Sequence, residues 1–258
     1  MDLQALRARH PAKTVTAGGL AWEVVDTGSA GPAVLMLPGA QGSAEVFGAQ
    51  LLALGGRMRL IAVGLPDTAE AEALADGLAA LMDALALPAA SIAASSFGAH
   101  VAQVFAHRHP ARVRKLLLGN SFPDPTPYQA PDKLASARDT PAEALKQQAL
   151  DRLASQPDSP LKALLLELVG TRQSAAQLKA RMLGLQLARP VPPLGIPAAR
   201  VTLVECDNDP LVAPPVREAM RARFPGSAAH VIAGGGHYPY VVRPDDYNRI
   251  LEAAMAAP

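Results

Sequence analysis

The sequence predicts an α/β protein built on a mostly parallel, doubly wound sheet. Short apolar runs that are typical of buried strands alternate with stretches whose apolar residues recur at helical spacing. Half of the 258 residues are hydrophobic, which is enough for the core of one large domain. The alternation breaks between residues 123 and 195, where no run has strand character, so we expect a helical insertion there.

The strands are expected in the following places along the chain. Two β-rich runs around Gly18 and Gly19 predict a hairpin, because paired glycines suit a tight turn. Continuous apolar runs then predict four buried strands: AVLMLPG, RLIAVGLP, ASIAAS and RKLLLGNSF, the last with its strand at 115–122. After the insertion, RVTLVE and AHVIAG predict two more strands, with helices near 214–224 and 244–255.

The insertion opens with the proline-rich loop PDPTPYQAP and contains no strand. Residue patterns predict three helix starts in it: a capping box at Thr140-Pro141-Ala142-Glu143, a start at Ser159-Pro160, and a second capping box at Ser174-Ala175-Ala176-Gln177. We therefore predict an α/β core of residues 1–122 and 196–258, with residues 123–195 forming a helical lid over the sheet.

Composition argues against several kinds of partner and location. The chain has 24 basic and 23 acidic residues, which gives no reason to expect nucleic acid or an acidic membrane surface. Cys206 is the single cysteine, so no intramolecular disulfide can form. The start MDLQALRARH lacks the apolar core of a signal peptide, and no apolar run approaches the ~18 residues of a transmembrane helix. We expect a cytoplasmic protein with no membrane span.

The stretch Ala94-Ser95-Ser96-Phe97-Gly98 joins a predicted strand to a predicted helix, where sheets of this kind place a nucleophilic serine in a G-x-S-x-G turn. The residues two before and two after such a serine must be small, because larger side chains would collide in the turn. With Ser96 as the nucleophile these positions hold Ala94 and Gly98, whereas Ser95 would place Phe97 at a crowded position. We predict Ser96, although a structural junction with two capping serines fits the pentapeptide equally well.

A nucleophilic serine needs a general base, and the base needs an orienting carboxylate. On this kind of sheet the acid and then the histidine follow the serine in the chain, each at the end of a strand. His237 follows the last predicted strand in a glycine-rich loop, and Asp209 follows the preceding strand, next to Pro-Leu-Val. We predict the triad Ser96, Asp209 and His237, with Asp207 and Asp124 left as alternative acids.

An oxyanion hole on such a site uses two backbone N–H groups. The first is expected at Phe97, directly after the nucleophile, and the second in the loop 38–42 after the first buried strand. We place the second at Ala40, with Gln41 as the alternative, and a tight turn into the next helix explains the same loop. His100 and Cys206 are expected to be packed residues. The sequence has no metal-ligand cluster, phosphate loop or nucleotide motif, so we infer no cofactor and no metal.

With these residues in place, the chain resembles the α/β-hydrolase superfamily over nearly its whole length, with the maspardin-like branch as the nearest match. Four stretches carry the resemblance: LPGAQGSAEVFGAQLLAL, SSFGAHVAQVFAHRHPARV, LLLGNSFPD and GGGHYPYVVRPDDYN. The resemblance implies an eight-stranded sheet with helices on both faces, a helical lid, and serine esterase or related chemistry. Maspardin-like proteins are chiefly binding or adaptor proteins whose histidine position is not reliably a histidine, and His237 departs from that pattern.

These observations lead to three hypotheses. The first is a serine hydrolase that cleaves a small-molecule ester with a small or medium apolar acyl group. Leucines at 164–166, 183 and 185 suggest an apolar pocket in the lid, although helical packing explains them equally well. The second is a non-catalytic protein that holds a protein partner on the same fold. The third is another reaction of the same triad, such as C–C bond hydrolysis.

Overall fold

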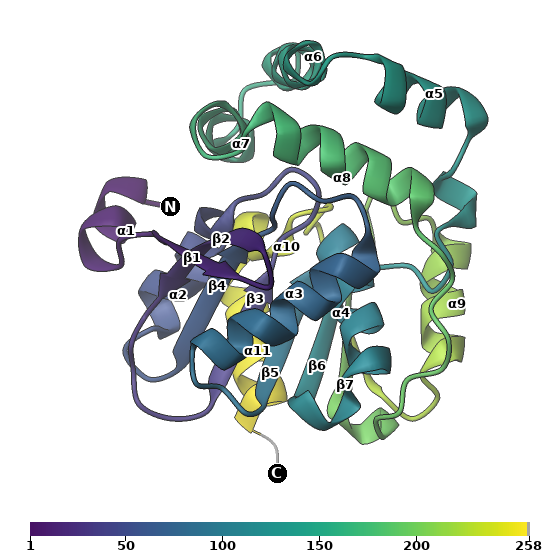
Figure 1. Cartoon of the computed structure of the whole chain (residues 1–258). Helices are drawn as coiled ribbons and strands as arrows, with labels where there is room; N and C mark the ends of the chain where they lie inside the picture. Colours follow the sequence, from purple (N-terminus) through teal and green to yellow (C-terminus); the bar gives the residue numbers. More distant parts are fainter. Residues whose placement is uncertain (257–258) are drawn as a thin grey trace.

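Eight strands form one sheet in the order β1-β2-β4-β3-β5-β6-β7-β8 in this computed structural model, which describes residues 1–256 (Figure 1). The strands are β1 (Lys13–Ala17), β2 (Leu20–Asp26), β3 (Ala33–Leu37), β4 (Arg59–Gly64), β5 (Ala90–Ser95), β6 (Val113–Gly119), β7 (Val201–Cys206) and β8 (Ala228–Ile232). β2 pairs antiparallel with both β1 and β4, and the remaining pairs are parallel. The predicted mostly parallel, eight-stranded sheet is confirmed.

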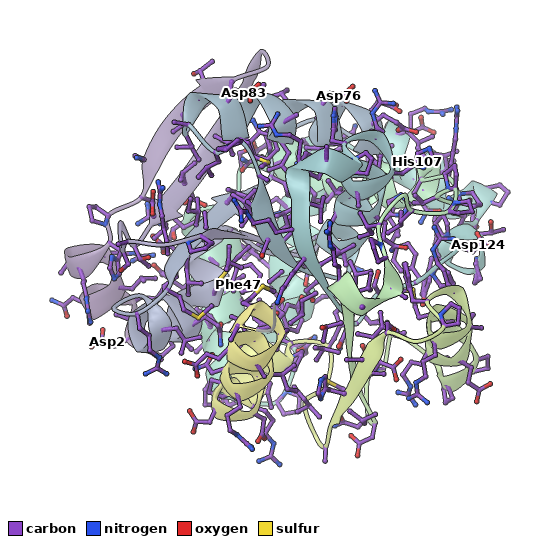
Figure 2. All side chains as sticks on the ribbon, turned by 90° about the horizontal axis from the view of Figure 1, so that it is seen from below. Asp2, Phe47, Asp76, Asp83, His107 and Asp124 are labelled. Carbon is purple, nitrogen blue, oxygen red and sulfur yellow. The ribbon has the colours of Figure 1, made fainter. Side chains whose placement is uncertain are left out.

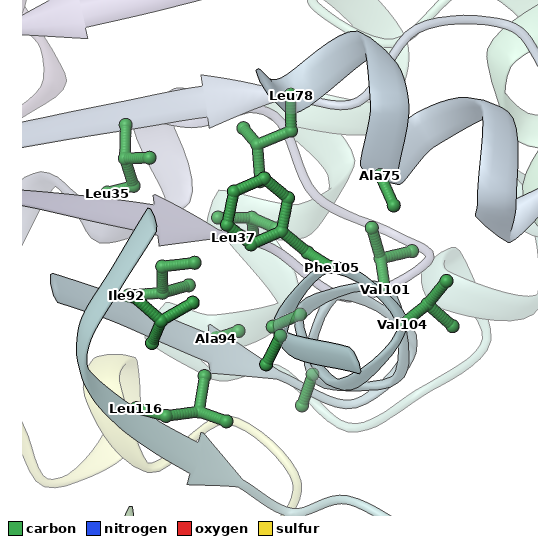
Figure 3. Close-up of a cluster of buried hydrophobic side chains, with 14 of the residues drawn as sticks. Leu35, Leu37, Ala75, Leu78, Ile92, Ala94, Val101, Val104, Phe105 and Leu116 are labelled. Atoms are coloured by element: carbon green, nitrogen blue, oxygen red, sulfur yellow. The ribbon is translucent and has the colours of Figure 1, made fainter. Parts of the chain in front are cut away.

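Each face of the sheet carries its own apolar core, because successive strand residues point to opposite faces. On one face the core includes α3 (Ala71–Ala84), α4 (Phe97–Arg108) and the end of α9 (Pro214–Arg223). Figure 3 shows this contact between strand residues and helix residues: Leu35, Leu37, Ile92, Ala94 and Leu116 against Ala75, Leu78, Val101, Val104 and Phe105. The opposite core includes α1 (Leu3–Arg9), α2 (Gly48–Leu54), α10 (Pro239–Val242) and α11 (Pro244–Ala256). Buried strands between two helical layers explain the unbroken apolar runs in the sequence.

Four α-helices lie between β6 and β7 in the chain and gather at the top of the view in Figure 1. They are α5 (Pro131–Asp139), α6 (Ala142–Ala154), α7 (Pro160–Thr171) and α8 (Ala175–Leu187), and we call them the α5–α8 segment. All three predicted helices are present, and two of the predicted starts are correct to the residue. The Ser159 hydroxyl accepts a hydrogen bond from the N–H of Lys162, and Ser174 and Gln177 form the predicted capping box.

The predicted capping box at Thr140 is wrong. The backbone N–H of Thr140 donates to Ser136 and ends α5, while Pro141 is extended and α6 begins at Ala142 without a side-chain cap. Helix α5 was not predicted, because it is polar nearly all round and buries only Ala137, so no apolar periodicity marks it. Helix α1 was not predicted either; it has only seven residues and buries only Leu6. Among residues 1–256, no helix is long and apolar enough to cross a bilayer.

Candidate active site

Ser96 lies at the sharp turn between β5 and α4. Its backbone has φ 53° and ψ −124°, a conformation that L-residues rarely adopt and that costs roughly 1–3 kcal/mol. The turn is held on both sides, since the Ser96 N–H donates to the carbonyl of Gly119 at 2.9 Å and its carbonyl accepts from the N–H of His100 at 3.1 Å. A non-glycine residue strained in this way at a strand end is what the G-x-S-x-G pattern predicts for a nucleophile.

The three residues predicted as a triad meet at the ends of three strands. The Oγ of Ser96, after β5, lies 3.0 Å from Nε2 of His237, in the loop after β8. The Nδ1 of His237 lies 2.9 Å from Oδ2 of Asp209, in the loop after β7. An ionised carboxylate can only accept, so the imidazole proton belongs on Nδ1, and Nε2 is free to accept the hydroxyl proton of Ser96.

The surroundings of Asp209 keep its carboxylate ionised. Burial of the side chain, which is 1% exposed, raises the pKa. The hydrogen bond and electrostatic attraction of His237 and the N–H groups of Leu211 and Val212 outweigh this effect, so the pKa of Asp209 lies below its ordinary value. The N–H groups reach Oδ1 at 2.8 and 3.2 Å. The carboxylate is therefore available to orient the imidazole and to stabilise its protonated form.

The two alternative acids lie elsewhere. The Oδ1 of Asp207 accepts the N–H of Gly234 at 2.8 Å, which fastens the two loops that carry Asp209 and His237. Asp124 is exposed, its Oδ1 accepts the N–H of Thr126 at 2.8 Å, and Figure 2 shows it at the rim of the molecule. The side chain that contacts His237 in this structure is therefore that of Asp209.

The loop after β3 passes directly beside Ser96. A Cβ placed on Gly39 would lie 3.1 Å from Cβ and 3.7 Å from Oγ of Ser96, so a larger residue would press on the serine and shift it by a few tenths of an ångström. Ala40 follows Gly39 in the same loop. Phe97 is the first residue of α4, where an N–H group has no acceptor within the helix. Both predicted oxyanion donors thus lie on backbone next to the serine, and their role stays a prediction.

Sequence reasoning missed two polar residues at the site. Asn120, directly after β6, donates from Nδ2 to Oδ2 of Asp209 at 2.7 Å and to the carbonyl of Gly236 at 2.8 Å. Gln173, in the loop between α7 and α8, donates from Nε2 to the carbonyl of Ala40 at 2.7 Å. Asn120 could have been predicted, because it follows β6, the strand between β5, which leads to Ser96, and β7, which leads to Asp209. No signal in the sequence marks Gln173.

His100 and Cys206 are packed residues, as expected. Both ring nitrogens of His100 are buried without a hydrogen-bond partner, and its ring stacks on Phe122 with centroids 5.6 Å apart. Burial lowers the pKa of His100 to about 4, so its ring is neutral at physiological pH. Burial raises the pKa of the Cys206 thiol to about 11, which leaves no reactive thiolate. Within residues 1–256, no group of three or more His, Cys, Asp or Glu side chains is placed to hold a metal ion.

Comparison with known proteins agrees with the fold. A family model described as the alpha/beta hydrolase family matches residues 34–250. The chain belongs to this family. Maspardin from Homo sapiens is 29% identical over 241 residues, which cover 90% of this chain and 78% of maspardin, so the maspardin-like resemblance is confirmed.

One further relative of this alpha/beta hydrolase and one solved structure with a similar fold are named as esterases. The pimeloyl-[acyl-carrier protein] methyl ester esterase of Serratia marcescens is 28% identical over 260 residues and spans 92% of this chain and 98% of the relative. A solved structure of a thermophilic esterase from Thermogutta terrifontis superimposes with a TM-score of 0.78 at 22% identity, covering 95% of this chain and 97% of that one. The structural match establishes the fold, and the family supports hydrolase activity.

Proposed function

We propose that this protein is a serine hydrolase that cleaves carboxylic esters through an acyl-enzyme. The observation that carries the proposal is the hydrogen-bond chain from Ser96 Oγ to His237 Nε2 at 3.0 Å and from His237 Nδ1 to Asp209 Oδ2 at 2.9 Å. The strained φ of 53° at Ser96 adds a second, independent feature of a nucleophile.

The proposed mechanism follows from the tautomer that Asp209 imposes. Nε2 of His237 takes the hydroxyl proton while Oγ of Ser96 attacks the ester carbonyl carbon. The N–H groups of Phe97 and Ala40 hold the oxygen that becomes negative, each worth about 3–4 kcal/mol in comparable enzymes. The imidazolium then gives its proton to the departing alkoxide, which leaves as an alcohol. A water molecule, deprotonated by Nε2, releases the acid and restores Ser96.

The proposed substrate is a small-molecule ester with a small or medium apolar acyl group. Support comes from the Serratia relative, whose name states that it acts on a methyl ester. The lid leucines add little support, since Leu164 and Leu165 are at most 8% exposed and belong to apolar cores. The proposed lid role of residues 123–195 rests on the hydrogen bond from Gln173 to the loop beside Ser96.

Labelling with a fluorophosphonate probe tests the proposal. Such a probe reacts with a serine only when a base activates its hydroxyl. We expect labelling of the wild type, loss of labelling in Ser96→Ala, and loss in His237→Ala with the serine retained. Wild-type protein that folds correctly but never reacts with the probe would refute the proposal. Hydrolysis of p-nitrophenyl esters of increasing chain length would then define the acyl group.

A second candidate function is a non-catalytic binding protein, and the similarity to maspardin over 90% of this chain favours it. In that case the α5–α8 segment would hold a protein partner, and Ser96→Ala would leave partner binding unchanged. The intact contacts of Ser96, His237 and Asp209 argue for the enzyme. The same fluorophosphonate experiment separates the two candidates, because a binding protein has no need of an activated serine.

A further inference from the structure

We propose that Asn120 is a positioning residue of the triad, which locks the carboxylate of Asp209 and the loop of His237 in one arrangement. This inference rests on the proposed function, since it concerns how the same site is held. Asn120 lies at the end of β6, between β5, which ends before Ser96, and β7, which leads to Asp209. A side chain at the end of β6 can therefore reach into the space between the nucleophile and the acid.

The two hydrogens of the Asn120 amide have two different acceptors. One goes to Oδ2 of Asp209 at 2.7 Å and the other to the backbone carbonyl of Gly236 at 2.8 Å. Gly236 immediately precedes His237 in the chain. A single NH₂ group thus ties the acid to the backbone of the loop that carries the base. Loss of this group would remove one hydrogen bond from each partner at once.

The orientation of the Asn120 amide is fixed by its own contacts. Its backbone N–H donates to the carbonyl of Val204 at 2.9 Å, and its Oδ1 lies 3.8 Å from Sγ of Cys206, a weak thiol donor. A flipped amide would direct Oδ1 at the carboxylate of Asp209, oxygen against oxygen. The residue is 2% exposed, so water does not compete for these contacts.

The backbone of Asn120 also suits an asparagine. Its φ is 45°, in the left-handed region that glycine enters freely and that asparagine tolerates better than most other residues. Replacement by glycine therefore removes the amide while preserving the backbone. Replacement by aspartate keeps a residue of the same shape, but exchanges the donor for a carboxyl group. These two substitutions separate the hydrogen bonds from the local conformation.

The other groups that sense the charge of Asp209 are neutral near physiological pH. The Asp209 charge contributes to raising the pKa values of Tyr128, Cys206 and Tyr238, although burial is the main cause in each case. His237 and the N–H groups at 211 and 212 complete the donors to this carboxylate. Asn120 and His237 are thus the side-chain donors to Asp209 in the described structure, and loss of the Asn120 amide leaves Oδ2 with His237 alone.

The experiment compares Asn120→Gly and Asn120→Asp with the matched control Ser121→Ala. Ser121 is the next residue in the chain and is also buried and polar, but its Oγ accepts a hydrogen bond from Gln103 and does not contact the triad. Ester hydrolysis is measured as kcat and KM, and the Nδ1 proton of His237 is followed by ¹H NMR. We expect Asn120→Gly to lower kcat about 10- to 100-fold, the value of one charge-assisted hydrogen bond, at nearly constant KM. The downfield Nδ1 proton should shift or broaden, and Ser121→Ala should behave as the wild type.

Asn120→Asp adds a pH readout. Two carboxyl groups this close share a proton at low pH, and the shared proton can donate to Asp209, whereas at high pH both are ionised and repel. The ratio of kcat for Asn120→Asp to kcat for Asn120→Gly should therefore rise as pH falls. Unchanged kcat, pH ratio and Nδ1 resonance in folded variants would overturn the inference. The NMR readout needs no turnover, so it tests Asn120 even if the wild type proves inactive, an outcome that would refute the proposed function instead.

Discussion

A Cβ placed on Gly98 would lie 2.3 Å from the carbonyl oxygen of Pro38 and 2.7 Å from that of Leu37. Both are backbone atoms, so they cannot swing aside as a flexible side chain would. The first turn of α4 therefore rests directly on the start of the loop that passes beside Ser96. This contact explains in atomic terms why the position two residues after the serine must be glycine.

Gly98→Ala should lower both stability and activity. The methyl group must displace the backbone at Pro38, which costs about 1–3 kcal/mol as overpacking and shifts the loop that holds Ala40. Urea unfolding and ester hydrolysis measure the two effects. The matched control is Gly170→Ala in α7, where a Cβ meets nothing within 4 Å and should add about 0.5–1 kcal/mol of stability. A Gly98→Ala protein as stable and active as the wild type would contradict the steric argument.

Much of the fold and the strand-end placement of the candidate site followed from local sequence. Buried parallel strands need continuous apolar runs, and these runs marked β3 to β7 with boundaries close to those observed. Because the carboxyl ends of parallel strands lie on one edge of the sheet, the order Ser96, Asp209, His237 was enough to predict that they meet. That inference needed the topology and no knowledge of side-chain contacts.

The residues that support the site were harder to predict, because their partners are remote in the sequence. Asn120 and Asp209 are 89 residues apart, and Gln173 and Ala40 are 133 apart. Each contact depends on how two separate elements dock, which a polar residue in a loop does not reveal. The α5 helix was missed for a related reason, since a helix that buries a single alanine leaves no apolar pattern.

Substitution of the acids decides between Asp209 and its alternatives. Asp209→Asn should lower kcat about 10³- to 10⁴-fold, because the amide favours the wrong imidazole tautomer and cannot stabilise the imidazolium. Asp207→Asn retains an oxygen to accept the N–H of Gly234 and should remain active, as should Asp124→Asn at the exposed rim. Steady-state kinetics at constant pH measures all three. An inactive Asp207→Asn together with an active Asp209→Asn would identify Asp207 as the acid of the triad.

Gln173→Ala should affect the transition state more than substrate binding. Its amide anchors the carbonyl of Ala40. The neighbouring Arg172 lies 2.9 Å from the carboxylate of Glu45, in the 3-10 helix Ala44–Phe47 that follows this loop, so the α7–α8 connection also holds the segment into which the loop leads. Loosening the loop should misalign the oxyanion donor and reduce kcat about tenfold or more with little change in KM.

A transition-state analogue such as a boronic acid should lose affinity for Gln173→Ala in parallel with the fall in kcat. Gln177→Ala is the matched control, since Gln177 caps the same helix α8 but donates to the carbonyl of Leu65 instead. If both variants lose stability alike and neither changes kcat, the hydrogen bond to Ala40 serves only to fix the α5–α8 segment.

His100 should make the protein sensitive to mild acid. Its folded pKa is about 4 because burial excludes the charged ring, whereas in the unfolded chain the ring takes up a proton near its ordinary value of about 6.5. Between these values the unfolded chain binds a proton that the folded protein rejects. Stability is therefore unaffected above pH 6.5 and falls as pH drops towards 4, by about 3 kcal/mol at most. Urea unfolding at pH 7.5, 6, 5 and 4 would measure this loss.

His100→Phe should remove most of that pH dependence, because a phenyl ring can stack on Phe122 and has nothing to protonate. Between pH 7.5 and 4 its free energy of unfolding should fall less than that of the wild type, by the amount assigned to His100. His107→Gln is the control for the loss of a histidine from the same helix, since His107 is exposed. If the free energy of unfolding falls equally in wild type and His100→Phe, other groups, such as the buried carboxylate of Asp209, cause the loss of stability in acid.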